Sequence, residues 1–205
     1  VVAVHPNDRE FVMKAIDGAL YERKPYSIDH RIVRPDGIER IVHEEAEVTF
    51  DASGKPVRMG GTGQDVTGRK RAEQQLVTLR KAVNTSGEVI FLTDREGIIT
   101  FANPEFTHLY GYTAEEVIGK VTARILKSGK LPQEAYEEFW KTILNKQIVK
   151  GEILNKTKDG RFVTVEGSTS PILDEGRNII GFLAIQRDIT DRKRAEAALR
   201  EGEER

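Results

Sequence analysis

The sequence predicts an α+β fold in which an antiparallel sheet carries helices on one face, and it predicts two copies of that fold. Three observations lead to this prediction. Similar segments recur at a spacing of 123 residues, Asp-Gly turns separate extended runs rich in β-branched residues, and an amphipathic helix precedes those runs in each copy. A chain of 205 residues, 38% of them hydrophobic, has room for one large or two small cores.

The repeat is clearest in a charged cassette of twelve residues. DVTGRKRAEQQL begins at Asp65, and DITDRKRAEAAL begins at Asp188. The same spacing aligns the Asp-Gly pair at 36–37 with the pair at 159–160. Because several features recur at one spacing, we interpret the chain as two copies of one domain type.

In each copy, extended runs separated by turns predict three antiparallel strands ahead of the cassette. The first strand is expected at residues 26–34 and again at 149–157, and the other two follow an Asp-Gly turn and a second turn that contains Asp51 or Asp174. Asp-Gly between extended runs favours a hairpin, because both residues tolerate positive φ.

An amphipathic helix is expected ahead of these strands, at residues 5–24 and 131–147, with Pro6 and Pro132 near the two helix starts. Residues spaced by three and four positions define the face of each helix that should be buried. These residues are Phe11, Ala15, Ala19 and Leu20 in the first copy, and Tyr136, Phe139, Trp140, Ile143 and Leu144 in the second.

The second copy is the more complete of the two. Upstream of its helix, EVIFLTD and IITFAN predict a further hairpin around the turn REG, and NPEFTHLYGYTAEEVIGK predicts two short helices. The first copy has no counterpart of these segments, and the chain starts at Val1 without a methionine. We therefore expect an N-terminally truncated first domain and a parent protein longer than this chain.

These segments together resemble the PAS family with its C-terminal PAC motif. In the second copy the resemblance lies in FLTDREGIITFANPEFTHLYGYTAEEVIGK, KTKDGRFVTVEGSTSPILDEG and GFLAIQRDITDRKRAE, and in the first copy in HPNDRE, HRIVRPDGIERIV and GTGQDVTGRKRAE. It implies a PAS fold with a sheet of about five strands. The expected segments are 1–67 for the C-terminal part of the first PAS domain, 68–83 for a linker helix, 84–190 for a complete second PAS domain, and 191–205 for the start of an output coiled-coil helix.

The resemblance implies a sensory module that relays ligand or redox state to an output domain, most often in two-component sensor histidine kinases and also in cyclic-dinucleotide enzymes. The chain itself is not expected to be an enzyme, because it has no phosphate-binding loop, no histidines at metal-ligand spacing and no G-x-S-x-G motif. Two alternatives remain open, a structural dimerisation spacer without ligand and a flavin-using enzyme domain.

Composition and charge limit the kinds of partner and chemistry that the chain can have. A net charge of −1 disfavours nucleic-acid binding, which needs a basic surface, and no apolar run is long enough to cross a membrane. We therefore expect a cytoplasmic location. The absence of cysteine excludes a cysteine–flavin adduct, a thiolate metal site and disulfides.

Haem and non-covalent flavin are the two candidate cofactors for the second copy. Haem is disfavoured, because its one histidine, His108, falls in a short helix and haem-binding relatives usually carry the ligand in the long helix. Residues 123–160 resemble flavin-binding PAS domains of redox-sensing regulators, including nitrogen-fixation regulators. This resemblance implies non-covalent FAD or FMN, with Trp140 against the ring and Asn155 at its polar edge. The alternative for Trp140 is a helix aromatic packed on the sheet, and for Asn155 an ordinary polar strand residue.

The histidines of the first copy suit no metal site, because they are dispersed through a helix start and two strands. His5, His30 and His43 are therefore interpreted as structural or exposed residues.

Each cassette predicts a junction between a strand and a helix, followed by an apolar stripe for contact with a second helix. Asp65 and Thr67, like Asp188 and Thr190, stand where a strand passes into a helix, so their side chains could cap helix amides. In PAS proteins this element resembles the joint that passes domain state to the output helix. An a/d stripe suited to a partner helix follows, which predicts a parallel homodimer through the helices and PAS domains. The stripe consists of Ala72, Leu76, Leu79 and Val83, and begins again with Ala195 and Leu199.

Overall fold

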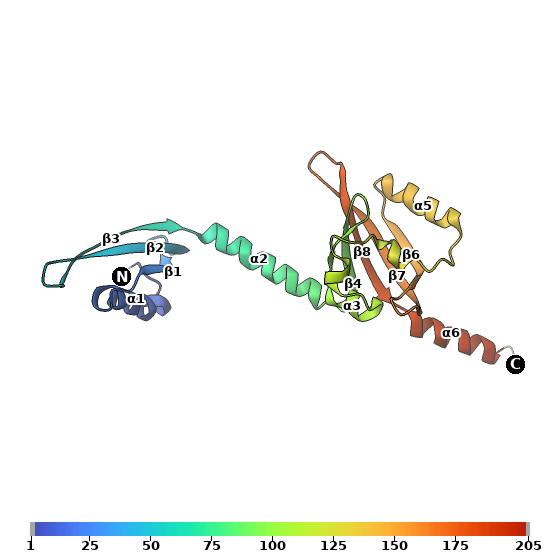
Figure 1. Cartoon of the computed structure of the whole chain (residues 1–205), viewed down its shortest axis with the longest axis horizontal. Helices are drawn as coiled ribbons and strands as arrows, with labels where there is room; N and C mark the ends of the chain where they lie inside the picture. Colours follow the sequence, from blue (N-terminus) through green and yellow to red (C-terminus); the bar gives the residue numbers. More distant parts are fainter. Residues whose placement is uncertain (1–2, 204–205) are drawn as a thin grey trace. The chain divides into compact units, whose positions relative to one another are not determined.

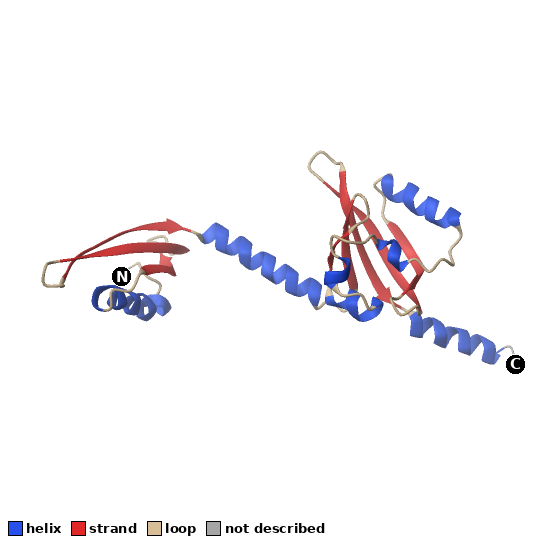
Figure 2. Ribbon diagram, viewed as in Figure 1, coloured by secondary structure: helices blue, strands red, loops and turns tan. Residues whose placement is uncertain are grey.

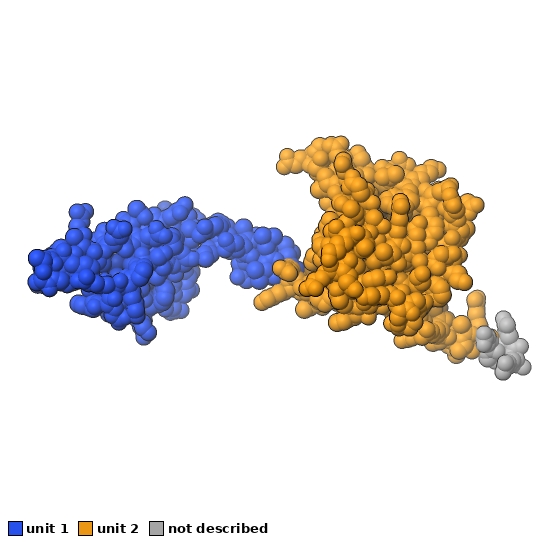
Figure 3. Space-filling model, viewed as in Figure 1, with its two compact units in different colours: residues 1–79 blue, residues 80–205 orange. Residues whose placement is uncertain are grey.

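The computed structural model describes residues 3–203 and forms two compact units, residues 1–79 and 80–205 (Figure 3). Positions 1, 2, 204 and 205, at the outer ends of the predicted segments 1–67 and 191–205, lie outside the described residues. The helix α2 (Thr67–Asn84) begins in unit 1 and ends in unit 2. No helix of the described chain is long and apolar enough to span a membrane.

Unit 1 is a three-stranded antiparallel sheet in the order β1-β2-β3, and its helix α1 packs on β1 and β2 (Figures 1 and 2). The chain enters through a short 3-10 turn, where proline is tolerated because the first amides of a helix have no internal partner. The elements are η1 (Pro6–Asp8), α1 (Arg9–Tyr21), β1 (Tyr26–Val33), β2 (Glu39–Phe50) and β3 (Pro56–Asp65).

Unit 2 is a five-stranded antiparallel sheet, as the sequence predicts; the structure gives its strand order, β5-β4-β8-β7-β6, and an additional 3-10 turn that was not expected. The first strand of the unit, β4, pairs with β5 on one side and with the last strand, β8, on the other, so the two ends of the unit meet between β4 and β8. The elements are β4 (Val89–Asp94), β5 (Ile99–Ala102), α3 (Pro104–Tyr110), α4 (Ala114–Val117), η2 (Ala123–Leu126), α5 (Gln133–Leu144), β6 (Val149–Lys156), β7 (Phe162–Leu173), β8 (Ile179–Asp188) and α6 (Thr190–Glu203).

The repeat seen in the sequence extends to the strand boundaries. Both ends of β1, β2 and β3 move onto both ends of β6, β7 and β8 when the chain is shifted by 123 positions. The pairing register moves with them, because Val42 lies opposite Asp65 and Val165 lies opposite Asp188. The last three strands therefore have the same bounds and pairing in both units. We call this three-stranded arrangement the strand frame.

The turns between these strands are built alike in both copies. Gly37 and Gly160 have φ of 80° and 88°, which glycine adopts without steric strain. At the second turn the Asp51 and Asp174 carboxylates each accept a hydrogen bond from the backbone amide four residues later, at 2.9 and 2.7 Å. These local bonds explain why both hairpins were recognisable in the sequence.

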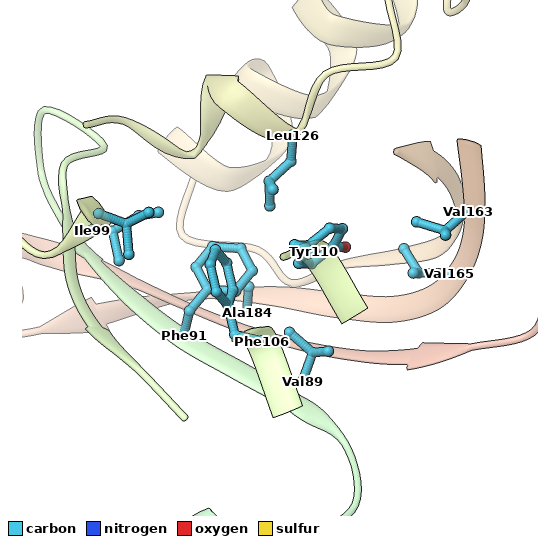
Figure 4. Close-up of a cluster of buried hydrophobic side chains, with 10 residues drawn as sticks. Val89, Phe91, Ile99, Phe106, Tyr110, Leu126, Val163, Val165 and Ala184 are labelled. Atoms are coloured by element: carbon cyan, nitrogen blue, oxygen red, sulfur yellow. The ribbon is translucent and has the colours of Figure 1, made fainter. Parts of the chain in front are cut away.

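The core of unit 2 lies between the sheet and its helices (Figure 4). Phe106 on α3 is fully buried and packs edge-on against Phe91 and at a tilt against Tyr110, with ring centroids 5.5 and 5.2 Å apart. Buried Asn103 fixes the start of α3, because its Oδ1 accepts from the amides of Ile90 and Phe106. The core therefore ties α3 to β4.

The prediction that Phe11 and Leu144 lie on the buried helix faces is wrong. Phe11 is 52% exposed and Val12 is buried in its place, and Leu144 is 57% exposed beside the buried Ile143. The other residues of both predicted faces are buried or half-buried, so each prediction differs from the structure at one end of the face only. The buried stripe of α1 then runs through Val12 and Ala19 and that of α5 through Ile143, each of which reaches the sheet.

Replacing Phe106 by alanine should lower the free energy of unfolding of unit 2 by about 3–5 kcal/mol, because it leaves a large cavity in the core. Urea unfolding followed by the fluorescence of Trp140, the one tryptophan of the chain, measures this in unit 2. Phe162→Ala is the matched control: its side chain is 42% exposed, and we expect a loss below about 1 kcal/mol. Equal losses for the two variants would contradict this description of the core.

Candidate functional site

Unit 2 contains a cavity of about 490 Å³ between the sheet and the segment formed by η2 and α5. Its walls come from β4, β6, β7 and β8 on the sheet side and from η2 and α5 on the other side. Ligand pockets in proteins usually measure about 300–1,000 Å³ and are mostly apolar with a few convergent polar groups. The size therefore suits a small organic molecule.

Both residues that the sequence singled out for a cofactor line this cavity. Trp140 on α5 contacts Phe139 and Phe182 edge-on, with centroids 5.5 and 5.9 Å apart, so it packs on the sheet and also forms cavity wall. Asn155 on β6 is buried in the opposite wall. The structure thus brings together two residues from separate elements, and the two interpretations of Trp140 are compatible.

A chain of directed hydrogen bonds crosses the inner wall. The Asn155 amide donates to the Tyr110 hydroxyl at 2.8 Å, and Tyr110 donates to Oε1 of Gln186 at 2.5 Å. This direction leaves the acceptor Oδ1 of Asn155 and the donor Nε2 of Gln186 without another protein partner among residues 3–203. Asn155 and Gln186 therefore supply one acceptor and one donor at the cavity wall.

The buried residues of the cavity lining carry no charge, whereas the exposed lining residues carry both signs: Arg124, Lys127 and Lys150 together with Glu96, Glu138 and Glu152. Burial raises the pKa of Tyr110 far above its usual range, so the hydroxyl keeps its proton and can donate to Gln186. Arg124 and Lys127 line the outer part and are exposed, and the Lys127 ammonium lies 3.8 Å from the centre of the Tyr136 ring. The interior therefore suits a neutral polar edge, and Arg124 and Lys127 place two cations close together in the sequence on one side of the cavity.

Tyr110 and Gln186 were not found from the sequence. A signal for Gln186 existed, because Phe182, Ala184 and Gln186 alternate on β8 and all three face the cavity. A polar residue at the end of an inward apolar stripe could have been noticed. Tyr110 gave no such signal, since its role depends on strands that follow it by more than forty residues.

The first copy does not repeat the amide pair. At the spacing of 123 residues, Ile32 stands at the position of Asn155 and Gly63 at that of Gln186. Neither residue offers a side-chain donor or acceptor. Unit 1 therefore shares the strand frame of unit 2 and lacks its polar edge.

The histidines lie apart from the cavity of unit 2. His108 is 72% exposed and contacts Glu105 on its own helix at 3.2 Å. His30 is buried in unit 1 without a hydrogen bond to its ring, and His5 lies 3.3 Å from Glu39. No group of three or more metal-ligating side chains occurs within the described chain.

The two joints between strand and helix have the same geometry. Asp65 Oδ1 accepts from the amide of Thr67 at 2.9 Å, and Asp188 Oδ1 accepts from that of Thr190 at 2.8 Å. The threonine hydroxyl of each joint then accepts from a strand amide: Thr67 from Ile41 at 2.8 Å, and Thr190 from Thr164 at 2.9 Å. Hydrogen bonds from Thr67 also lower the pKa of Asp65, which keeps its carboxylate charged. We call the aspartate and threonine of each joint, with these hydrogen bonds, the Asp-x-Thr clasp.

The a/d stripe lies on the surface of its helices. Leu76 and Leu79 are 68% and 63% exposed on α2, and Ala72 is also exposed. Val83 is half-buried near the end of the helix, and on α6 both Ala195 and Leu199 are exposed. Large exposed apolar side chains in a helical row are uncommon on isolated domains.

Comparison with known proteins identifies the two units. Residues 87–191 match the family model described as PAS domain, and residues 2–63 match the model described as PAS fold. A PAS-domain crystal structure from Colwellia psychrerythraea is 31% identical, covers 57% of this chain and 98% of that chain, and has a TM-score of 0.53. A structure described as "Flavin Analogue Sheds Light on Light-Oxygen-Voltage Domain Mechanism" is 25% identical, covers 62% of this chain and 95% of that one, and has a TM-score of 0.50.

Two curated relatives are signalling or regulatory proteins. A nitrogen fixation regulatory protein of Klebsiella pneumoniae is 34% identical over 53% of this chain and 22% of its own length. The probable diguanylate cyclase DgcE of Escherichia coli is 26% identical over 93% of this chain and 18% of its own length. The chain thus spans about a fifth of each relative.

His43 beside the first clasp should titrate above its ordinary value. Hydrogen bonds to Glu45 and Asp29, at 3.1 and 2.7 Å, raise its pKa from 6.5. The folded state thus binds this proton more tightly, and the stabilisation is present below the unfolded pKa and lost as pH rises through the folded pKa. Glu45→Gln should lower the pKa of His43 measured by NMR of its ring protons. Glu47→Gln, on the same strand, should leave it unchanged, and an equal shift in both variants would contradict the assignment.

Proposed function

The chain belongs to the PAS domain family and carries two PAS-type regions of a signalling protein, and from this premise we propose that unit 2 binds a flavin and relays its state to an output domain. The observation that carries the ligand proposal is the acceptor of Asn155 and the donor of Gln186, which Tyr110 links in the cavity wall. Such a pair complements a planar ring whose edge bears an imide, with one N–H and an adjacent carbonyl.

The rest of the cavity supports the same class of ligand. Trp140 and the other aromatic side chains of α5 offer a surface for a flat ring. The exposed Arg124 and Lys127 at the rim suit the phosphate of FMN or FAD. A bound flavin would supply reversible redox chemistry and absorption of visible light. With no cysteine in the chain, binding would be non-covalent.

Strand β8 offers a direct route from this ligand to the output helix. Gln186 contacts the proposed ligand edge, and Asp188 of the clasp follows it by two residues on the same strand. A change in the hydrogen bonding of Gln186 would therefore act on the strand that ends in the clasp. We propose a histidine kinase as the output domain. A diguanylate cyclase is the second candidate, because the Escherichia coli relative aligns with 93% of this chain.

The exposed stripe on α2 supports a parallel homodimer. Leu76 and Leu79 would meet their counterparts in a second copy, with Ala72 and Val83 in the same seam. A seam of this length is short for a stable coiled coil, so contacts between the domains would supply part of the stability of the dimer.

Purified protein titrated with FMN should show the visible absorption of bound flavin, and Gln186→Leu should weaken binding about tenfold or more, because it removes a buried donor. Quenching of flavin fluorescence gives the dissociation constant. The control is Gln147→Leu, which changes an exposed glutamine after α5 and should bind like the parent. A protein that binds neither FMN nor FAD would refute the proposal, and a Soret band would replace flavin by haem.

Leu76→Glu and Leu79→Glu should each shift the chain from dimer to monomer, because they place a charge in the apolar seam. Sedimentation velocity distinguishes the 23.1 kDa monomer from a species of twice that mass. Thr78→Glu changes an exposed residue outside the stripe and should leave the dimer intact. A parent chain that stays monomeric at high micromolar concentration would refute dimerisation through this stripe.

A further inference from the structure

Each helix that follows a clasp carries a lysine in its first turn that reaches back to the sheet. The Lys70 ammonium of α2 lies 2.6 Å from the Asp29 carboxylate on β1, and that of Lys193 on α6 lies 2.7 Å from the Glu152 carboxylate on β6. The two ion pairs are related by the same spacing of 123 residues as the strands. Because the contact occurs twice in equivalent places, it is a feature of the frame.

We infer that this lysine–carboxylate pair, which we call the strand tether, positions the helix in the relay. The inference rests on the proposed function, because it describes how a change of the ligand in the cavity of unit 2 would alter the direction of α6. The Asp-x-Thr clasp holds the first residue of α6 to β7 and β8. The tether adds β6 and acts three residues later, about one turn along the helix.

Two attachment points constrain the direction of a helix, whereas one lets it pivot. The hydroxyl of Thr190 binds at Thr164, and Lys193 binds at Glu152 on the neighbouring strand. A relative shift of β6 and β7 would then tilt α6. The tether therefore turns a small movement within the sheet into a change of helix direction.

The strand that carries the tether carboxylate also forms part of the cavity wall. Glu152 lies between Gly151 and Ile153 on β6, and these three residues, like Asn155 three positions further on, line the cavity. A ligand that contacts Asn155 thus contacts the strand to which α6 is tied. This gives a second route to the helix, separate from the route through Gln186 and β8.

Charge makes the second tether the more important of the two. Glu152 lies directly opposite Glu166 in the pairing of β6 with β7, and like charges at such positions repel. Arg192 lies 3.9 and 3.7 Å from these two carboxylates, so α6 supplies the cations that relieve the repulsion. In the first copy His43 stands opposite Asp29 and binds it at 2.7 Å, which leaves Asp29 a partner besides Lys70.

Hydrogen exchange of the backbone amides of α6 in the 205-residue chain tests the tether. Lys193→Glu should speed exchange of the amides after residue 193 about two- to fivefold, the range expected for a partly exposed ion pair. The charge-swapped double variant Lys193→Glu with Glu152→Lys should return the rates to within about twofold of the parent. The fluorescence of Trp140 shows whether unit 2 of each variant is folded.

Arg194→Glu is the matched control, because Arg194 contacts only Asp191 of its own helix among the ion pairs of the described residues. It should change the rates less than twofold, and Lys70→Glu should affect α2 less than Lys193→Glu affects α6. Equal effects of Lys193→Glu and Arg194→Glu, or a swap that fails to restore the rates, would overturn the tether. An equal or larger effect of Lys70→Glu would overturn the role given to Glu166.

The same measurement with FMN separates the tether from the proposed ligand. Saturating FMN should alter the exchange of α6 in the parent, and Lys193→Glu should reduce that response by at least half. FMN that binds and alters α6 equally in both proteins would overturn the tether as part of the relay. FMN that does not bind refutes the flavin proposal, while the ligand-free exchange rates still decide whether the tether holds the helix.

Discussion

The organisation of unit 2 depends on the position of β8 in the middle of its sheet. This strand pairs with β4 along one edge and with β7 along the other, so its backbone is bonded on both sides and cannot shift without its neighbours. Its inward side chains form part of the cavity wall, and its last residue belongs to the clasp. A single backbone therefore runs from the cavity wall to the start of α6.

The two copies share a frame and differ in what the frame encloses. Strand boundaries, register, turns, clasp and tether recur at one spacing, because each is set by backbone hydrogen bonds or by short contacts between a helix and a strand. The interior positions are free to vary within that frame. Ile32 and Gly63 in unit 1 stand where Asn155 and Gln186 supply the polar edge of unit 2. The repeated part is thus the set of strands with the attachments of the following helix, and the variable part includes the polar residues that line the cavity of unit 2.

Sequence reasoning succeeded where the signal is local. The Asp-Gly turns, the period-two strands and the capping residues of the clasps each occupy a few consecutive positions, and the structure has strands and turns where they were expected. It failed where two elements must meet. Whether Phe11 or Val12 is buried near the start of α1 depends on how the helix lies on β1 and β2, and a helical pattern with several apolar residues allows either. Of the residues described for the cavity, the sequence named Trp140 and Asn155, and it did not name Tyr110 and Gln186, whose hydrogen bonds orient Asn155.

The sequence by itself determined the fold class, the two copies, the order of their strands and the residues of the joints, since these follow from periodicity, turn chemistry and capping within short stretches. Only the tertiary structure decided what surrounds the cavity. Tyr110 stands between Asn155 and Gln186 because α3, β6 and β8 converge there, although the three residues are far apart in the chain. The direction of their hydrogen bonds, and hence the donor and the acceptor offered to a ligand, exists only once these segments have packed together. The strand tether is decided in the same way, because Lys193 and Glu152 acquire their roles only when the helix leaves the sheet at the angle that the folded strands impose.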